Sequence, residues 1–339
     1  MSDKSTIHDI ASLLNITAST VSRALNDHPK ISDATKHKVI VAAKKLNYQP
    51  NTIAAALRNG RTKVVGVLVP TIDRHYFASV IHSMEEVLNA AGYQVIVAQT
   101  NDSPEIEKTK LNTLLNAQVA GIVASFAKHN TTFEHYQDVI ASGIPLILFD
   151  RYHDSLDIDT VVIDDYMGAF KATEHLIEQG CQRIVHFTST SQISIYKERK
   201  RGYLDALIAN NVTLDESLIW ESGLSLEDGM TLGRKLLSEH KKVDAVFSSS
   251  DFAAIGAMQE IKKSKDKDIS GIKFFGFSNE TLSQFIDPPL SSVDQLSMTI
   301  GKISANRLLE RINHNNTQAL PTQKTVLTPK LCIRASSNG

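Results

Sequence analysis

Several residue types that define whole classes of protein are scarce in this 339-residue sequence. Its two cysteines, Cys181 and Cys332, lie far apart and lack the close spacing of metal ligands. This excludes a disulfide-stabilised scaffold and favours a reducing, cytoplasmic location. No apolar run approaches the roughly 20 residues of a membrane-spanning helix, and the first eight residues lack the basic and apolar segments of a secretory signal. We therefore expect a cytoplasmic protein without membrane contact.

Motifs for catalysis, nucleotide binding and metal binding are also missing. The sequence has no Ser-His-Asp order, no Walker loop and no His/Cys cluster at metal-ligand spacing. We therefore expect no catalytic residue, no metal and no cofactor. A sugar-converting enzyme that uses Asp150 or Asp251 is one alternative, which an assay for turnover would reveal. A solute-binding module that delivers sugar to a transporter is another, although the missing signal and the basic N-terminal region argue against it.

What is present is a globular composition with an uneven distribution of charge. Apolar residues make up 42% and charged residues 22% of the chain, and its length suits two or three domains. Residues 1–61 hold nine Lys/Arg against four Asp, a net charge of +5, which leaves −6 on residues 62–339. A basic N-terminal region on an acidic body is expected when only that region approaches a polyanion. A solvated helical surface is the alternative.

The first 49 residues show three short helical patterns. Thr6 and Asp9 have the spacing of a capping box, and apolar residues follow from Ile7 at i, i+3, i+4 and i+7. Thr17 can cap a second helix, and a third helix begins at Ser32. Two short helices with a tight turn, followed by a longer one, predict an all-α helix-turn-helix headpiece. A three-helix module for protein contacts is the alternative.

The outer face of the second helix is small and polar, which suits the major groove of DNA. Ser, Thr and Ala side chains can lie against base edges and thymine methyl groups, and Arg23 can bind guanine with ~1–3 kcal/mol of discrimination. The helix start at Thr17–Thr20 can donate backbone N–H groups to a phosphate. The predicted DNA-binding residues of this region are Thr6, Thr17, Ala18, Ser19, Thr20, Ser22, Arg23 and Asn26.

Residues 50–61 predict a hinge or linker helix. Asn51 can cap it, and its length of under three turns is marginal in isolation, so it should form only when something packs on it. Leu57 is an apolar side chain on an alanine-rich segment, which suits a wedge between base steps in the minor groove. A plain linker helix is the alternative. Asn51, Ala54, Leu57 and Arg58 complete the predicted DNA site.

Residues 62–339 alternate apolar, β-branched runs with amphipathic helices. This rhythm predicts parallel sheets with helices on both faces, and the length predicts two such α/β lobes. Strands are expected at 64–69, 94–98, 121–124, 146–149, 161–163, 184–187, 245–247 and 273–277. A late strand at 290–293, a helix at 300–312 and a strand at 324–327 predict a chain that crosses between the lobes more than once.

Ligands of open parallel sheets bind beyond the carboxyl ends of the strands, so the segments that follow strands should meet in a cleft between the lobes. Carboxylates and arginines there suit the vicinal hydroxyls of a sugar, and aromatic rings suit its C–H faces. Tyr76 and Phe77 could instead belong to the core of their helix. The predicted effector-binding residues are Tyr76, Phe77, Ser125, Asp150, Arg151, Lys197, Arg199, Asp251, Ser278 and Asn279.

Four segments resemble the headpiece of the LacI/GalR family of bacterial repressors. They are Thr6-Ile7-His8-Asp9-Ile10-Ala11, Thr20-Val21-Ser22-Arg23-Ala24-Leu25-Asn26, Leu46-Asn47-Tyr48-Gln49-Pro50-Asn51 and Ala54-Ala55-Ala56-Leu57-Arg58. The resemblance implies that Ala18, Ser19 and Arg23 read the major groove. It also implies a homodimer in which Leu57 intercalates beside its symmetry mate, with a higher assembly as the alternative. The operator of such a dimer is a pseudo-palindrome.

The resemblance extends to the body and implies a fold like that of periplasmic sugar-binding proteins. Arg199, three residues before Gly202-Tyr203, stands where the family has its effector-binding arginine, and Ser249-Ser250-Asp251 matches the family's cleft segment. Tyr76 and Phe77 match an aromatic pair that lines the pocket in relatives. The resemblance implies a transcriptional repressor whose effector changes the lobe angle and the spacing of the hinges. The opposite sign, in which ligand tightens DNA binding, also occurs in the family.

One departure from the family pattern bears on the effector. Gly276-Phe277 is followed by Ser278, where the family usually has an aspartate that binds the effector. Loss of that carboxylate from a pocket with Arg199, and with Arg151 or Lys197 nearby, should make the cleft more positive. The hypothesis is therefore a sugar acid or a sugar phosphate as effector, with a neutral sugar as the alternative.

Overall fold

A computed structural model describes residues 5–48, 62–191, 193–239, 243–264, 271–314 and 320–338. The chain divides into two compact units, Met1–Thr62 and Lys63–Gly339. We call the first the headpiece and the second the core unit, and each is described by itself. None of the helices in these ranges has the length and apolar character that crossing a bilayer requires.

The headpiece contains three helices whose starts follow from local sequence: α1 (Ile7–Leu14), α2 (Ala18–Leu25) and α3 (Asp33–Lys45). The expected capping box is confirmed, because the Thr6 backbone N–H donates to the Asp9 carboxylate (2.7 Å) and the Asp9 N–H donates to Thr6 Oγ1 (3.4 Å). Thr17 Oγ1 accepts the Thr20 N–H at 3.2 Å and caps α2. Ser32 caps α3 in the same way. Small alanines around Ile10 and Val39 let the three helices pack closely over a small core.

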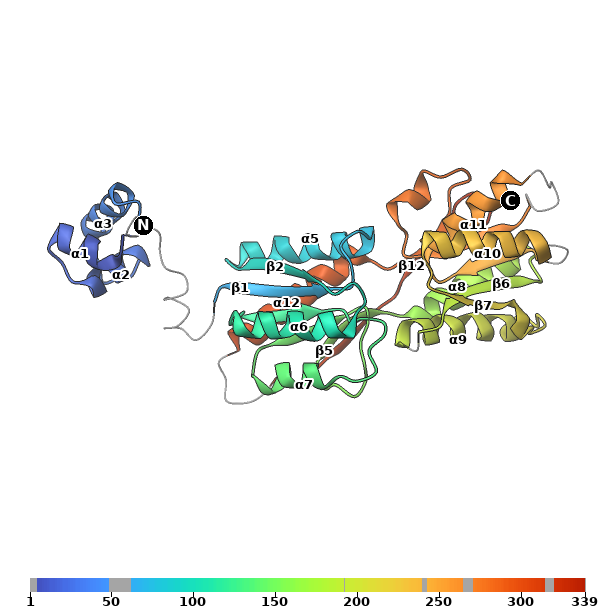
Figure 1. Ribbon diagram of the computed structural model, residues 1–339, viewed down its shortest axis with the longest axis horizontal. Coiled ribbons are helices and arrows are strands. Elements are labelled where there is room, and N and C mark those ends of the chain that lie inside the picture. Colours follow the sequence, from blue (N-terminus) through green and yellow to red (C-terminus); the bar gives the residue numbers. More distant parts are fainter. Residues whose placement is uncertain are drawn as a thin grey trace. The chain divides into compact units, whose positions relative to one another are not determined.

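The N-terminal lobe of the core unit is built on a six-stranded parallel sheet of order β11-β5-β4-β3-β1-β2 (Figure 1). Its strands are β1 (Val64–Val69), β2 (Gln94–Gln99), β3 (Gly121–Ala124), β4 (Leu146–Phe149), β5 (Asp159–Ile163) and β11 (Lys324–Leu327). Its helices are α5 (His75–Ala90), α6 (Pro104–Asn116), α7 (Glu134–Ala141) and α12 (Ser297–Asn313).

The C-terminal lobe repeats this plan with the sheet order β12-β10-β9-β8-β6-β7. Its strands are β6 (Ile184–Ser189), β7 (Ile219–Ser222), β8 (Ala245–Ser248), β9 (Lys273–Phe277), β10 (Ser291–Asp294) and β12 (Lys330–Cys332). Its helices are α8 (Asp165–Glu178), α9 (Ser194–Ala209), α10 (Leu226–Glu239) and α11 (Asp251–Lys263), with 3-10 turns at Glu216–Leu218 and Thr281–Gln284.

Helices cover both faces of each sheet, as the apolar strands predicted. Along β1, Val65 and Val67 belong to one buried cluster with residues of α5 and α12, whereas Leu68 belongs to another with residues of α6 and α7. Side chains that alternate along a strand point to opposite faces, so both faces of this sheet are packed. In the C-terminal lobe, Phe247 faces α8 and α9 while Val246 faces α10 and α11.

Two features of the C-terminal sheet differ from the prediction. β7 was not expected, and β12 pairs with β10 in the antiparallel direction, so this sheet is not wholly parallel. β12 enters from the other lobe directly after β11, without the helical crossover that a parallel neighbour needs. Because β12 reaches the C-terminal sheet through this short segment, it pairs with β10 at the edge of the sheet and runs antiparallel to it.

The chain crosses between the lobes three times, which confirms the expectation of more than one crossing: after β5, before α12 and between β11 and β12. At the start of β5 and β11, the buried Asp159 carboxylate is bound by Arg307 and Arg311, whose guanidinium groups also donate to the Pro321 carbonyl. These contacts fix α12 to the segment that leads into β11. The three crossings connect the two lobes, while each lobe keeps its own sheet.

Candidate DNA-binding surface and ligand cleft

The predicted DNA-binding residues of α2 lie on one exposed helix start and face. Thr17 and Ser19 are exposed, and the Thr17 hydroxyl lies 2.9 Å from the hydroxyls of Ser19 and Thr20. Arg23 is also exposed, and its guanidinium makes no hydrogen bond or ion pair with any described residue. This face therefore offers hydroxyls and one unengaged guanidinium to a partner.

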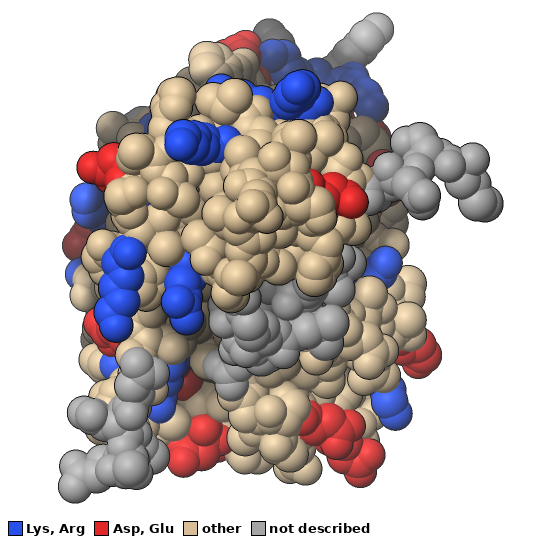
Figure 2. Space-filling view, turned by 90° about the vertical axis from the view of Figure 1, so that its left-hand side faces the viewer, with Lys and Arg blue, Asp and Glu red and all other residues tan. Residues whose placement is uncertain are grey.

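The remaining predicted DNA-binding residues are placed as follows. Ala18 and Ser22 are half-buried, and the exposed Asn26 donates its side-chain amide to the Ser22 carbonyl at 2.8 Å. Thr6 is exposed, and its hydroxyl donates to Asp9 within the capping box. The predicted hinge residues, Asn51, Ala54, Leu57 and Arg58, lie outside the described residues. Charged side chains on one side of the molecule can be followed in Figure 2.

A cleft of about 650 Å³, open to solvent at its mouth, lies between the two lobes of the core unit. Its wall comes from segments that follow strands of both sheets, as expected for parallel sheets. Four residues of the wall hold backbone conformations that side-chain-bearing residues rarely adopt: Asp102 with φ 59°, Asp150 with φ 61°, Leu224 with φ 62° and Ser278 with φ 119°. Such conformations gather at functional sites. Of the predicted effector-binding residues, the cleft is lined by Tyr76, Phe77, Asp150, Arg151, Arg199 and Ser278.

Arg199 is held rigidly at the base of the cleft. Its Nε and Nη2 both lie 2.8 Å from Asp165 Oδ1, and its Nη1 donates to the Ser249 carbonyl at 2.9 Å. The guanidinium carbon lies 3.6 Å from the centre of the Phe277 ring. Burial raises the pKa of Asp165 to about 7, against the opposing effect of Arg199. The guanidinium is thus oriented by three contacts before any ligand arrives.

Asp150 lies beside Arg199 and is supported from behind. Ser125, which is fully buried and does not line the cleft, donates its hydroxyl to Asp150 Oδ2 at 3.2 Å. Gln295 approaches Asp150 Oδ1 at 3.5 Å. Burial raises the pKa of Asp150, while Arg151 and Arg199 counteract it. Ser125 therefore orients a ligand-facing carboxylate and does not itself face the ligand.

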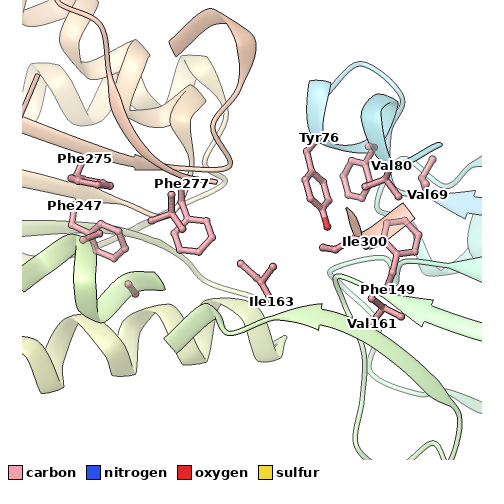
Figure 3. Packing of buried hydrophobic residues seen from close by; sticks show 14 of the residues in the cluster. Val69, Tyr76, Val80, Phe149, Val161, Ile163, Phe247, Phe275, Phe277 and Ile300 are labelled. Carbon is pink, nitrogen blue, oxygen red and sulfur yellow. The ribbon is translucent and has the colours of Figure 1, made fainter. Parts of the chain in front are cut away.

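Two buried hydroxyls on the cleft wall lack a hydrogen-bond partner among the described residues. They are Tyr76 Oη and Ser249 Oγ, on residues that are 5% and 2% exposed. Figure 3 shows Tyr76 at the edge of the N-terminal lobe cluster that faces Phe277. Burial raises the pKa of the Tyr76 phenol, and the negative charge of Asp150 raises it further. The phenol therefore stays neutral and can donate a hydrogen bond. A buried hydroxyl left unpaired costs ~1–3 kcal/mol, and a polyhydroxylated ligand would relieve that cost.

Four predicted residues do not face the cleft. Ser125 is behind Asp150, and Lys197 is exposed on α9 away from the cleft lining. The Asn279 side chain is engaged by Arg334, which donates to its oxygen at 2.7 Å. Asp251 is 0% exposed and accepts three hydrogen bonds, from Glu280 N, Ser283 Oγ and Ser292 Oγ. With its oxygens engaged, Asp251 holds the fold of the C-terminal lobe and is not available to a ligand.

Sequence reasoning missed four charged residues of the cleft wall. They are Arg74, Asp102, Lys128 and Glu280. Asp102 binds the Arg151 guanidinium, accepts the Lys128 N–H at 3.0 Å and lies 3.8 Å from Lys128 Nζ. The sequence does contain a signal for Asp102, because this residue follows the end of β2 as Asp150 follows the end of β4.

These carboxylates bear on the expectation of a more positive cleft. Glu280, two residues after Ser278, returns a carboxylate to the cleft wall. Each arginine or lysine of the wall now lies near an acid: Arg151 and Lys128 near Asp102, and Arg199 near Asp165. Arg74 acts on Glu280 electrostatically. The wall thus carries four cationic side chains, Arg74, Lys128, Arg151 and Arg199, and three carboxylates, Asp102, Asp150 and Glu280. No group of three or more His, Cys, Asp or Glu among the described residues has the arrangement of a metal site.

Comparisons with known proteins agree with this architecture. A family model described as "Periplasmic binding proteins and sugar binding domain of LacI family" matches residues 62–332, and one described as "Bacterial regulatory proteins, lacI family" matches residues 6–51. The HTH-type transcriptional regulator DegA of Bacillus subtilis is 30% identical over 336 residues, which cover 99% of this chain and 98% of DegA.

Solved structures give the same result. The transcriptional regulator CelR in complex with cellobiose is 26% identical with a TM-score of 0.73, and the match covers 98% of this chain and all of CelR. The lac repressor dimer bound to operator is 23% identical with a TM-score of 0.86, over 99% of this chain and all of that chain. The second match concerns the fold, which is the predicted one: a helix-turn-helix headpiece and a two-lobed α/β core.

Proposed function

The chain belongs to the LacI family of bacterial regulatory proteins, a family of DNA-binding transcriptional repressors and not of enzymes, and from this premise we propose how its two units act. Residues of α2 bind the major groove of an operator, and the cleft of the core unit binds a carbohydrate that changes operator affinity. The observation that carries the proposal is a pair of unpartnered buried hydroxyls beside a fixed carboxylate and a fixed arginine, in a unit joined to a helix-turn-helix headpiece.

For DNA, we propose that Arg23 reads a guanine while Thr17, Ala18, Ser19 and Thr20 lie along base edges and phosphates. The exposure of Arg23 and its freedom from described partners support this role. An operator is first selected from fragments of the host genome with the full chain. Arg23→Gln should then lower affinity for it by about 5- to 150-fold, the equivalent of one lost bidentate base contact.

The matched control for Arg23 is Lys45→Gln, which removes one positive charge from the end of α3. Both variants lose the same charge, so a difference between them reports base recognition and not general attraction to DNA. Equal losses in the two variants, or an equal loss on unrelated duplexes, would contradict base reading by Arg23.

For the effector, we propose a neutral sugar in the cleft. Hydroxyl pairs suit Asp150 and Arg199, and single hydroxyls suit Tyr76 and Ser249. The three carboxylates of the wall support a neutral ligand over a sugar acid or sugar phosphate, and CelR, whose complex holds cellobiose, is similar over 98% of this chain. Calorimetry with a hexose, its uronic acid and its 6-phosphate tests this proposal. Tighter binding of an acidic member would reinstate the anionic effector.

We further propose a cytoplasmic homodimer that binds a pseudo-palindromic operator, with Asn51, Ala54, Leu57 and Arg58 on the minor groove. The two-fold symmetry of such a dimer would be mirrored in its operator. The domain limits proposed for this arrangement are residues 1–49, 50–61 and 62–339. Sedimentation of the chain with and without operator, at a ratio of two chains per duplex, tests the stoichiometry.

A further inference from the structure

Helix α5 begins without a cap from its own segment. Its N-cap residue, Arg74, makes no side-chain capping hydrogen bond. The first N–H groups of a helix have no partner within the helix, so a start of this kind needs an acceptor from elsewhere. Here the acceptor comes from the other lobe: the Glu280 carboxylate accepts the His75 N–H at 3.0 Å across 205 residues of chain.

We propose that Glu280 is a latch between the lobes, whose carboxylate caps α5 when the lobes are closed and thereby positions Arg74 and Tyr76 on the cleft wall. A Glu280 oxygen can accept the helix-start N–H group in either protonation state, and the helix dipole offsets part of the cost of burying its charge. Since Arg74 and Tyr76 flank the capped N–H group, an intact cap fixes the wall that a ligand meets. Glu280 is thus a positioning residue that acts through α5.

The base of this latch is rigid. The Glu280 N–H donates to Asp251 Oδ2 at 2.7 Å, and Asp251 is in turn held by the hydroxyls of Ser283 and Ser292 at 2.7 and 2.6 Å. Both carboxylate oxygens of the buried Asp251 thus accept hydrogen bonds that fix the backbone at Glu280. Glu280 therefore moves with the C-terminal lobe, and its side chain reports the distance between that lobe and α5.

Other contacts also join the two lobes. The Arg74 guanidinium carbon lies 3.9 Å from the centre of the Phe252 ring, which follows Asp251 in α11. Ser191 of the C-terminal lobe donates its hydroxyl to the Lys128 carbonyl of the N-terminal lobe at 2.7 Å. Among these contacts Glu280 alone places a carboxylate on a helix start, so its protonation state can change the strength of closure.

The surroundings of Glu280 give closure a pH dependence. The groups that face it are Arg74 and the first N–H groups of α5 from one lobe and Asp251 from the other. Burial, followed by Asp251, raises the pKa of Glu280 to about 7. When the lobes open and water reaches the carboxyl group, its ordinary value of about 4.5 returns. Closure then takes up a proton between about pH 4.5 and 7, so it weakens as the pH rises through that window and is constant above it.

Amide hydrogen exchange of the full chain tests the cap without DNA or effector. In Glu280→Ala the N–H groups at the start of α5, His75–Ala78, should exchange about 5- to 30-fold faster, because the capping acceptor is lost. Glu280→Gln keeps an oxygen acceptor and should stay near the wild-type rate. Glu85→Gln, which removes an exposed carboxylate from the same helix, is the matched control and should change nothing.

A second variant separates capping from general destabilisation. His75→Pro removes the donor at a helix position where proline is tolerated, and Glu280→Ala should then have a smaller effect than in the wild type. Unchanged exchange at His75–Ala78 in Glu280→Ala would overturn the latch. Equal acceleration there and throughout α10, or full additivity of the two substitutions, would also overturn it.

The pH profile of lobe closure tests the coupling itself. Fluorescent labels on Asn89→Cys and Ala209→Cys, exposed positions of the two lobes, report the distance between them. In the wild type the closed fraction should fall from pH 5 to 7.5. In Glu280→Gln the fall should be shallower, and what is left of it belongs to the other buried carboxyl groups at the cleft, Asp150 and Asp165. Identical profiles in both proteins would overturn the proposal. Because neither DNA nor sugar is present, that result would leave the proposed regulator function intact.

Discussion

A buried hydroxyl can raise or lower the stability of the core unit, depending on whether it has a hydrogen-bond partner, and two tyrosines show the difference. The Tyr76 hydroxyl has no partner in the described residues, whereas the buried Tyr203 hydroxyl donates to the Ile184 carbonyl at 2.8 Å. An unpaired buried hydroxyl weakens the fold, and a paired one contributes to it. Stability given up at Tyr76 is therefore evidence for a ligand that completes the site.

A pair of substitutions makes this contrast measurable. Tyr76→Phe should leave the free energy of unfolding unchanged or raise it by up to about 1 kcal/mol, because no hydrogen bond is lost. Tyr203→Phe should lower it by about 1 kcal/mol, because the Ile184 carbonyl loses its donor. Urea denaturation of both variants gives the answer, and destabilisation of Tyr76→Phe equal to that of Tyr203→Phe would show that Tyr76 has a structural partner.

His186 makes the core unit sensitive to acid. It is 0% exposed, its ring contacts those of Tyr203 and Phe247, and its pKa is lowered to about 3 because burial disfavours the charged ring. A lowered pKa means that stability is fully present above the unfolded value of about 6.5 and is lost as the pH falls from there toward 3, by up to about 1.4 kcal/mol per pH unit. His186→Phe should flatten this part of the stability profile measured by urea denaturation. An unchanged slope would mean that another group titrates.

At the scale of elements, local signals were predictable and tertiary ones were not. The caps at Thr6, Thr17 and Ser32 depend on neighbours three residues away, so the sequence contains all the information for them. The edge strands β7 and β12 depend on partners far along the chain, and β7 is only half-buried, which hides its pattern. Whether a residue after a strand faces the cleft also depends on tertiary packing. Asp150 faces it and Asp251 does not, although both follow a strand.

Two helices of the C-terminal lobe approach closely enough to require glycine. A Cβ on Gly256 of α11 would lie 2.2 Å from the Leu226 carbonyl oxygen of α10. Backbone atoms cannot move aside as a flexible side chain can, so Gly256→Ala should lower the melting temperature through a loss of roughly 1–3 kcal/mol. Gly271→Ala, where nothing lies within 4 Å, is the matched control. Equal melting temperatures for the two variants would contradict the close packing.

The proposed hinge helix can be tested as an element of its own. Leu57→Ala should lower operator affinity, because the wedge that unstacks a base step is lost. Sugar binding should remain nearly unchanged, since the cleft lies in the core unit. Fluorescence anisotropy with operator and calorimetry with sugar measure the two effects separately. Unaltered operator binding would remove the hinge role, and an equal loss of sugar binding would point to a general defect.

At the scale of the whole molecule, the two binding events must be linked by one coupling free energy. If a sugar changes operator affinity by some factor, operator must change sugar affinity by the same factor and in the same direction. This equality holds whether the sugar weakens or tightens DNA binding. It follows from the thermodynamic cycle that joins the two binding events, whatever structural change carries the coupling.

A substitution at Glu280 tests whether the lobe arrangement carries this coupling. Glu280→Gln alters the equilibrium between lobe arrangements without touching α2, so it should shift operator affinity of the sugar-free protein at pH 7 while contacts with Arg23 stay the same. Coupling measured from the two directions should still agree within the variant, although the sugar-free affinity differs from that of the wild type. Titrations of operator with saturating sugar, and of sugar with saturating operator, give both factors. A factor of one in both titrations would mean that sugar and operator binding are not coupled, and the cleft would then not be the regulatory site. An unshifted sugar-free operator affinity in Glu280→Gln would mean that the lobe arrangement does not act on DNA binding.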